Sequence, residues 1–249
     1  MKSVLVTGGT TRIGKAIAER LRADGWRVLT SSHRVDAGAD IVANLAEPMG
    51  PARLYAAVME LLDGQPPDAL VNNAALYVGE DTEIEAIDFI APKKLTMLMA
   101  GRETAGRGSV VNILDTRVLN TVPRCVPART AERSETAAGR VGQTSVTTPQ
   151  PGTARGTESA YTCAKTALLA YTCDSAETFA ETLRVNAVAP GPVLAPTQIH
   201  EKAGELLVDR PTVDDVAAAV AYLLSARATT GCVIPVDGGQ SLLAREDAE

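Results

Sequence analysis

The sequence predicts an α/β protein built on one doubly wound parallel sheet with helices on both faces. Short runs rich in Val, Leu, Ile and Ala alternate with stretches whose apolar residues recur at helical spacing. Continuous apolar runs are typical of parallel strands that are buried on both faces, and their alternation with helical patterns indicates repeated βαβ units. A length of 249 residues suits one large domain of this class, residues 1–249.

Each expected strand coincides with one apolar run, and the first of them contains Val4, Leu5 and Val6. Strands are expected at residues 3–6, 27–31, 40–43, 69–72, 109–114, 184–188 and 232–236. Helical spacing places helices at residues 15–24, 51–63, 84–102, 159–183 and 213–225. Only residues 35–39 remain between the second and third strands, so a loop is expected to replace a helix there.

The charge balance argues against nucleic-acid binding as the main task. The chain carries 24 Lys and Arg against 30 Asp and Glu, a net charge of −6, and its pI is about 5.1. A protein that neutralises nucleic-acid phosphates needs a basic face. No export signal is evident, and no apolar run approaches the roughly 18 residues of a membrane helix. A cytoplasmic metabolic protein without a nucleic-acid or membrane partner is therefore expected.

Metal and disulfide sites are not expected. Cys125, Cys163, Cys173 and Cys232 are widely spaced, and only two histidines are present to join them. Cys163 and Cys173 would lie about 15 Å apart on one helix, beyond disulfide reach. We therefore expect buried thiols and no zinc site.

A glycine-rich turn at residues 7–14, TGGTTRIG, joins the first expected strand to the first expected helix. Gly8 can adopt backbone angles that other residues avoid. Gly9 and Gly14 have no side chain to block a pyrophosphate or the contact between helix and strand. The N–H groups at the helix N-terminus can then bind phosphates. The turn predicts a dinucleotide site, with a glycine turn that binds no nucleotide as the alternative.

Tyr161 and Lys165 are four residues apart on an expected helix, so both lie on one face, one turn apart. A neighbouring ammonium favours the phenolate, so we expect it to lower the pKa of Tyr161 from its reference of about 10. Such a phenol is a usable general acid.

These motifs, with the run NNAA at residues 72–75 and NAVAPG at residues 186–191, resemble the short-chain dehydrogenase/reductase family in order along nearly the whole chain. The resemblance implies a Rossmann-type fold, a nicotinamide cofactor, a homotetramer and catalysis by Tyr161 and Lys165. The cofactor-binding residues that it implies are Gly8, Arg12, Ile13, Gly14, Asn44, Asn73, Ala74, Ala75, Tyr161, Lys165, Pro190 and Gly191.

Asp115 distinguishes the chain from most of that family, whose members carry serine at this position. An aspartate there resembles the pteridine reductase branch, which reduces C=N bonds of pterin rings with Asp, Tyr and Lys. The chemistry is reasonable because the ring nitrogen must gain a proton as the neighbouring carbon accepts hydride. The alternative is that Asp115 only caps the following turn.

The residues at two further positions resemble those of the pteridine reductase branch. Arg12 lies in the glycine turn, where its guanidinium can face cofactor phosphates and a polar heterocycle. Tyr77 stands where that branch carries a phenylalanine that stacks on the pterin, and its flat ring offers a similar surface. The predicted substrate residues are thus Arg12, Tyr77, Asp115 and Tyr161, although Tyr77 is equally compatible with a packed surface aromatic.

The second expected strand is followed by His33 and Arg34, where an NAD-specific protein would carry an acidic residue for the ribose 2′-hydroxyl. A basic pair suits a 2′-phosphate, so NADPH is the predicted cofactor. Two residues depart from the family pattern: Asp88 replaces the usual Asn, and Asn44 replaces an acidic residue near the adenine. An acid beside Lys165 could draw the lysine charge away from Tyr161.

Residues 117–157 do not follow the alternation of strands and helices. They include eight Thr, six Arg, four Pro, four Gly and two Glu, with few apolar residues after Val126. This composition buries too little apolar surface to fold alone, so a flexible insertion at the rim of the site is expected. It is either a lid over the substrate or a loop without a role in catalysis.

The motifs together predict an NADPH-dependent reductase of C=N bonds in a pterin-like or related cyclic substrate, similar to pteridine and dihydrofolate reductases. A ketone or carbonyl reductase of a biosynthetic pathway is the alternative, and Asp115 in place of Ser discriminates between the two. A nucleotide-binding or scaffold protein with weak catalysis is a third possibility, against which the intact Tyr161 and Lys165 weigh.

Overall fold

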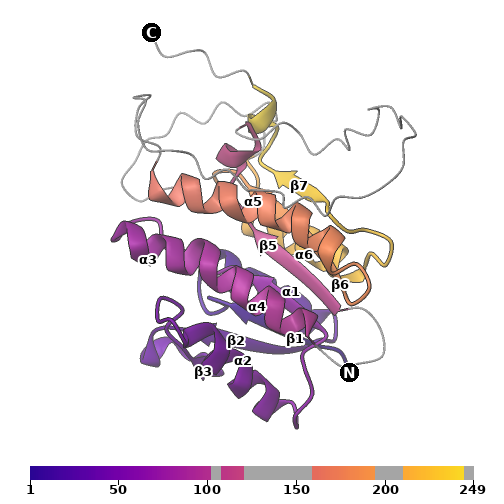
Figure 1. The fold of residues 1–249 in the computed structure, drawn as a ribbon. Helices are drawn as coiled ribbons and strands as arrows, with labels where there is room; N and C mark the ends of the chain where they lie inside the picture. The colour runs from indigo at the N-terminus through magenta and orange to yellow at the C-terminus, as the bar shows by residue number, and fades with distance from the viewer. Residues whose placement is uncertain (102–107, 121–158, 194–209, 244–249) are drawn as a thin grey trace, which may run out of the picture.

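A computed structural model describes residues 1–101, 108–120, 159–193 and 210–243 (Figure 1). Its centre is a seven-stranded parallel sheet in the order β3-β2-β1-β4-β5-β6-β7. The strands are β1 Ser3–Thr7, β2 Arg27–Ser32, β3 Ile41–Val42, β4 Ala69–Asn72, β5 Gly108–Ile113, β6 Leu183–Pro190 and β7 Val233–Val236. The strand order reverses between β1 and β4, so the predicted doubly wound sheet is confirmed. In such sheets ligands bind outside the carboxyl ends of the strands at this reversal.

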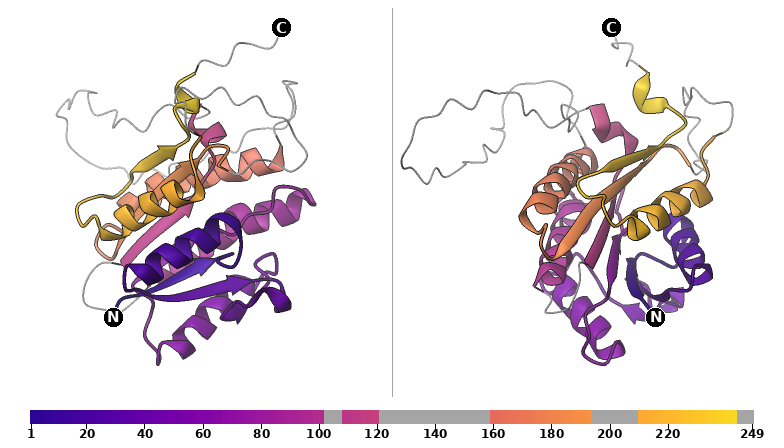
Figure 2. Two further views of the ribbon diagram at one scale, coloured as in Figure 1. Left: turned by 180° about the vertical axis from the view of Figure 1, so that it is seen from behind. Right: turned by 90° about the vertical axis from the view of Figure 1, so that its right-hand side faces the viewer.

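Helices cover both faces of the sheet (Figure 2). On one face α1 Arg12–Ala23 packs against α6 Val213–Ser225. On the other face lie α2 Gly50–Leu61, α4 Ala91–Ala100 and α5 Ala160–Thr178. Every residue of β1, β4, β5 and β6 is buried, which explains their continuous apolar runs. None of the described helices is long and apolar enough to span a membrane.

The structure corrects three predicted elements. The helix expected at 84–102 is divided into α3 Asp81–Glu85, the π-helical segment η2 Ala86–Ile90 and α4. Pro92 at the start of α4 lacks the N–H that a continuous α-helix would use, so the hydrogen-bond register changes before it. The helix expected at 159–183 ends at Thr178, because residues 179–182 form a turn that leads into β6 at Leu183. Residues 35–39 contain a short 3₁₀ helix, η1 Val35–Ala37.

The thiol prediction is wrong in one respect. Within the described ranges no disulfide joins Cys163, Cys173 or Cys232, but Cys163 is exposed and the other two are partly buried. Cys125 and residues 121–157 of the predicted insertion lie outside the described residues. The insertion's first residues belong to the fold, because the 3₁₀ helix η3 Thr116–Asn120 follows β5 and buries Val118.

A chain of buried polar groups fixes α5 on the sheet. The Asn72 side-chain amide donates to Asn112 Oδ1 at 2.8 Å, and the Asn112 amide donates to Thr172 Oγ1 at 2.9 Å. All three residues are at most 2% exposed. Because buried polar groups need partners, these bonds set the register of α5 against β4 and β5. This register places the first turn of α5 beside the carboxyl ends of the strands.

Candidate active site

The glycine turn has the backbone that the sequence predicts. Gly8 has φ +62°, in the left-handed region that favours glycine. A side chain at Gly14 would collide with the carbonyl oxygen of Gly8, and one at Gly9 would collide with Thr30. Arg12 opens α1 with φ +50°, and its side chain is exposed. Non-glycine residues in this region are uncommon and cluster at ligand sites.

Two polar side chains hold this turn against the end of β4. Thr7 Oγ1 accepts the N–H groups of Asn73 and Ala74, each at 3.0 Å. The Asn73 amide donates to the carbonyls of Thr7 and Gly8 at 2.9 and 3.1 Å. The side chain of Asn73, predicted for the cofactor, therefore fixes the glycine turn. Thr7 was not assigned a role by the sequence analysis, although it stands in the same motif.

The remaining predicted cofactor residues lie along the same carboxyl edge. Ile13 of α1 is partly buried against the core, and Ala75 is exposed after β4. Pro190 ends β6 and Gly191 follows it. Gly191 lies so close to Asp237 that an added Cβ would approach its Cα to 2.8 Å. Asn44 is exposed, and its side chain accepts the N–H of Ala46 at 3.0 Å.

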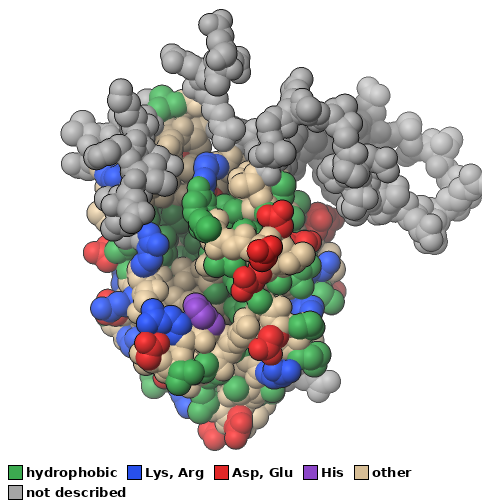
Figure 3. All heavy atoms as spheres, turned by 90° about the vertical axis from the view of Figure 1, so that its left-hand side faces the viewer, with side chains coloured by type: hydrophobic (Ala, Val, Ile, Leu, Met, Phe, Trp, Pro, Cys, Tyr) green, Lys and Arg blue, Asp and Glu red, His purple; other side chains and the backbone are tan. Residues whose placement is uncertain are grey.

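His33 and Arg34 follow β2 on the surface. The histidine coloured in Figure 3 is His33, because His200 lies outside the described residues, and basic side chains lie next to it. The Arg34 guanidinium forms an ion pair with Asp36 at 2.9 Å. Its hydrogen bond to Asp36 raises the pKa of Arg34. Arg34 is therefore a fully charged, exposed arginine that shares its charge with one neighbouring carboxylate.

Asp115, Tyr161 and Tyr77 come together between the end of β5 and the first turn of α5. The Tyr161 hydroxyl donates to Asp115 Oδ2 at 3.5 Å. The rings of Tyr77 and Tyr161 meet edge to face, with centroids 5.0 Å apart. Tyr161 is buried, whereas Tyr77 is 55% exposed. The structure thus brings together three of the four predicted substrate residues, and Arg12 is held on the neighbouring glycine turn.

Lys165 is bound to Asp88 and to the backbone of β5. Its ammonium forms an ion pair with Asp88 Oδ1 at 3.1 Å and donates to the carbonyl of Ile113 at 2.9 Å. The side chains of Lys165 and Asp88 are 2% and 0% exposed. Burial raises the pKa of Asp88, while Lys165 and the N–H of Leu76 oppose that rise. The competition of Asp88 for the charge of Lys165 was predicted from the sequence, and in the structure the Asp88 carboxylate is paired with the Lys165 ammonium.

The predicted direction of the Tyr161 pKa shift is wrong. Burial raises the pKa of Tyr161 above its ordinary value, and the carboxylates of Asp115 and Asp88 add to that rise. Lys165 lies 5.6 Å from the ring centroid of Tyr161 with its charge committed to Asp88. Helical spacing predicted that the two side chains share a face, but it could not predict the partner of the ammonium.

Arg117 is a site residue that the sequence analysis assigned only to the insertion. Its guanidinium binds both carboxylate oxygens of Asp115, with Nε to Oδ1 at 2.9 Å and Nη2 to Oδ2 at 2.8 Å. The hydrogen bond to Asp115 raises the pKa of Arg117. The only signal in the sequence was an acidic and a basic residue two positions apart directly after a strand.

Asp237 anchors the same segment from the far end of the chain. Its Oδ2 accepts the Thr116 hydroxyl at 2.6 Å and the Ser241 N–H at 2.9 Å, and Oδ1 accepts the Gly239 N–H at 2.9 Å. Asp237 is 4% exposed. Together with Gly191, it packs the chain after β7 against the residues that follow β5.

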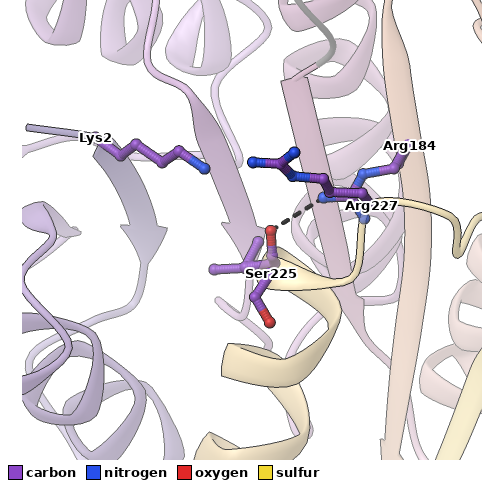
Figure 4. Close-up of a pocket in the computed structure, with 5 residues that line it drawn as sticks. Lys2, Arg184, Ser225 and Arg227 are labelled. Carbon is purple, nitrogen blue, oxygen red and sulfur yellow. Dashed lines mark hydrogen bonds between the residues drawn. The ribbon is translucent and has the colours of Figure 1, made fainter.

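A cavity of about 330 Å³ lies at the opposite, amino-terminal edge of the sheet and contains none of the predicted site residues. Lys2 and Arg227 point toward each other across it (Figure 4). Arg184 donates to the carbonyls of Leu223 and Leu224 at the end of α6. Cations are favourable at a helix C-terminus, so this position explains the presence of Arg184 in the lining.

The chain is similar to known proteins over nearly its whole length. The family described as enoyl-(acyl carrier protein) reductase matches residues 9–241. Granaticin polyketide synthase putative ketoacyl reductase 2 of Streptomyces violaceoruber is 31% identical, over 96% of both chains. Pteridine reductase 1 of Leishmania tarentolae is 27% identical, again over 96% of both chains. The structure of FolM alternative dihydrofolate reductase 1 from Brucella canis, complexed with NADP, matches with a TM-score of 0.74, 28% identity and coverage of 100% and 98%.

Proposed function

The chain belongs to the short-chain dehydrogenase/reductase family, and from that premise we propose that it is an NADPH-dependent reductase of C=N bonds in a pterin-like or related cyclic substrate. The observation that carries this proposal is the Asp115 carboxylate at the Tyr161 hydroxyl, where most of the family carries serine. The similarity to a pteridine reductase and to an NADP-bound alternative dihydrofolate reductase supports it.

The glycine turn fits a dinucleotide, because Gly14 lies so close to the Gly8 carbonyl that no side chain could stand there. The residues that would hold NADPH are those of the turn, Asn73 to Ala75, His33, Arg34 and the end of β6. When bound, the cofactor supplies hydride. Tyr161 would then exchange its hydrogen bond to Asp115 for one to the ring nitrogen and donate its single hydroxyl proton there, and the phenolate that remains would regain a proton from water.

The direct test is NADPH oxidation with dihydrobiopterin, dihydrofolate, a cyclic imine and a panel of ketones. The proposal expects turnover of at least one C=N substrate. A ketone or carbonyl reductase is the second candidate, favoured by the similarity to the granaticin ketoacyl reductase. Turnover of ketones alone would establish that alternative.

Asp115→Ser tests which substrate class the site serves. We expect the variant to lose C=N reduction and to keep or gain ketone reduction, because serine restores the hydroxyl that most of the family uses. Initial rates with one substrate of each class measure the change. Unchanged rates with both substrates would mean that Asp115 only caps the turn before η3.

Arg34→Ala tests cofactor choice. We expect it to lower the affinity for NADPH relative to NADH by roughly tenfold, the scale of one charge-assisted hydrogen bond to a phosphate. Asp36→Ala is the matched variant, and it should raise NADPH affinity because it removes the carboxylate that pairs with Arg34. Fluorescence titration with both cofactors gives the affinities, and equal affinities in the unmodified protein would contradict the predicted preference.

We also propose that the protein is a homotetramer of the cytoplasm. Met97 and Leu98 of α4 are 53% and 37% exposed, beside α5. Exposed apolar side chains on one helix face support burial against another copy. Light scattering coupled to size exclusion measures the state.

A further inference from the structure

Arg117 is bound to Asp115 by more contacts than any of the residues predicted for the site. Besides the two guanidinium bonds, the backbone N–H of Arg117 donates to Asp115 Oδ1 at 2.9 Å. The Asp115 side chain is 18% exposed and that of Arg117 is 39% exposed. Paired contacts of arginine with carboxylate fix orientation as well as distance. Asp115 is therefore held on one side by Arg117, and Oδ2 also faces the Tyr161 hydroxyl.

The same guanidinium lies against both aromatic rings of the site. Its central carbon is 5.2 Å from the ring centroid of Tyr77 and 5.4 Å from that of Tyr161. Arg117 Nη1 also donates to the Tyr77 hydroxyl at 3.2 Å. Cations over aromatic faces at this distance are attracted to the rings. Arg117 thus joins the three predicted residues Asp115, Tyr77 and Tyr161 into one cluster.

The charges of the site divide between two pairs. Lys165 neutralises the buried Asp88, and Arg117 neutralises Asp115. Of these two cations, Arg117 lies beside the carboxylate that faces the Tyr161 hydroxyl. Its positive charge opposes the rise in the Tyr161 pKa that burial and the two carboxylates cause. Without Arg117, Asp115 would be an uncompensated anion next to the proton donor.

We propose that Arg117 is a positioning residue for the reduction, which holds the Asp115 carboxylate at the Tyr161 hydroxyl and places Tyr77 beside it. The inference rests on the proposed function for its substrate. Both oxygens of Asp115 are occupied by Arg117, so Asp115 acts as a fixed acceptor. Tyr161 is then the group that delivers the proton, and Asp115 and Arg117 hold its hydroxyl in place until the O–H bond turns to the ring nitrogen.

A double-mutant cycle with Arg117→Gln and Asp115→Asn tests this role. We expect Arg117→Gln to lower kcat on the order of 10²-fold, the cost of a misplaced catalytic group, with little change in the Kd of NADPH. If Arg117 acts through Asp115, Arg117→Gln should lower kcat by less than about threefold in the Asp115→Asn background. Arg117→Lys, which keeps the charge without the paired contact, should be intermediate. Arg53→Gln, which removes the exposed ion pair between Arg53 of α2 and Glu47, is the control and should leave kcat unchanged.

The inference would be wrong if the two substitutions lowered kcat independently of each other. It would also be wrong if Arg117→Gln and Asp115→Asn lost the same thermal stability and this loss accounted for the lost activity. A second measurement does not depend on turnover. With ¹³C-labelled tyrosine, the Cζ resonance of Tyr161, assigned with Tyr161→Phe, should move in Arg117→Gln and stay in Arg53→Gln. An unmoved resonance in Arg117→Gln would also overturn the inference.

The failure of the proposed function is distinguishable from the failure of this inference. If the protein reduces ketones and no C=N substrate, the proposed function is wrong, and the cycle is measured with a ketone. Non-additive effects with that ketone would still support Arg117 as a positioning residue. Additive effects with a C=N substrate would agree with the proposed function and would show that Arg117 does not position Asp115 for the reaction.

Discussion

Tyr161→Phe is expected to lower turnover by about 10²- to 10⁴-fold, the usual contribution of a positioned general acid. The phenyl ring keeps the edge-to-face contact with Tyr77, so the site should stay packed and NADPH should bind nearly as before. Steady-state rates and a cofactor titration measure the two effects separately. Because burial raises the Tyr161 pKa, the hydroxyl stays protonated, and the unmodified protein should not lose activity through Tyr161 as the pH rises toward about 10.

Tyr222→Phe is the matched control, because Tyr222 is an exposed tyrosine on α6, on the other face of the sheet. It should leave turnover unchanged. Full activity of Tyr161→Phe would show that another group donates the proton, and the assigned chemistry would then be wrong.

The buried pair of Lys165 and Asp88 gives the largest expected effect on stability. Lys165→Met should lower the free energy of unfolding by about 3–5 kcal/mol, because Asp88 then stays buried without its counter-charge. It should also abolish activity. Urea unfolding followed by circular dichroism measures the loss of stability.

The double variant Lys165→Met with Asp88→Asn removes both charges, and it should recover part of the lost stability. Asparagine keeps an oxygen that can accept the N–H of Leu76, as Asp88 Oδ2 does at 2.8 Å. A double variant that is no more stable than Lys165→Met, or a single variant that unfolds like the unmodified protein, would contradict the importance of this pair.

The fold was predictable because strand and helix signals are local. The strands β1, β4, β5 and β6 are buried along their whole length, and the apolar runs that mark them can be found without knowledge of their partners. The errors arose where the conformation of one segment depends on its contacts with another. Phe179 and Ala180 follow α5 in a turn and Leu183 begins β6, so apolar spacing alone extended the expected helix to residue 183. Pro92 marked the division of the helix at residues 84–102, but the π-helical register before it depends on packing.

The site was predictable as a set of residues and less so as a set of contacts. Asp115, Tyr161 and Tyr77 do meet. Helical spacing, however, gives the face on which Lys165 lies and not the end point of its long side chain, which reaches Asp88 and the carbonyl of Ile113. Arg117 belonged to a segment whose composition indicated a loop, and its role depends on a pairing that no periodicity encodes.

The hydrogen bond between Thr116 and Asp237 also bears on the order in which the molecule assembles. It joins residues 121 positions apart, so it forms only after most of the chain is available. Contacts of such separation in sequence are slow to form, because the closure of a long loop costs entropy before the contact repays it. During synthesis, β1, the glycine turn and β4 emerge and pair long before β7 does. The glycine turn and the end of β4 can therefore form early, whereas the segment that carries Asp115 and Arg117 is anchored by Asp237 only after β7 is made.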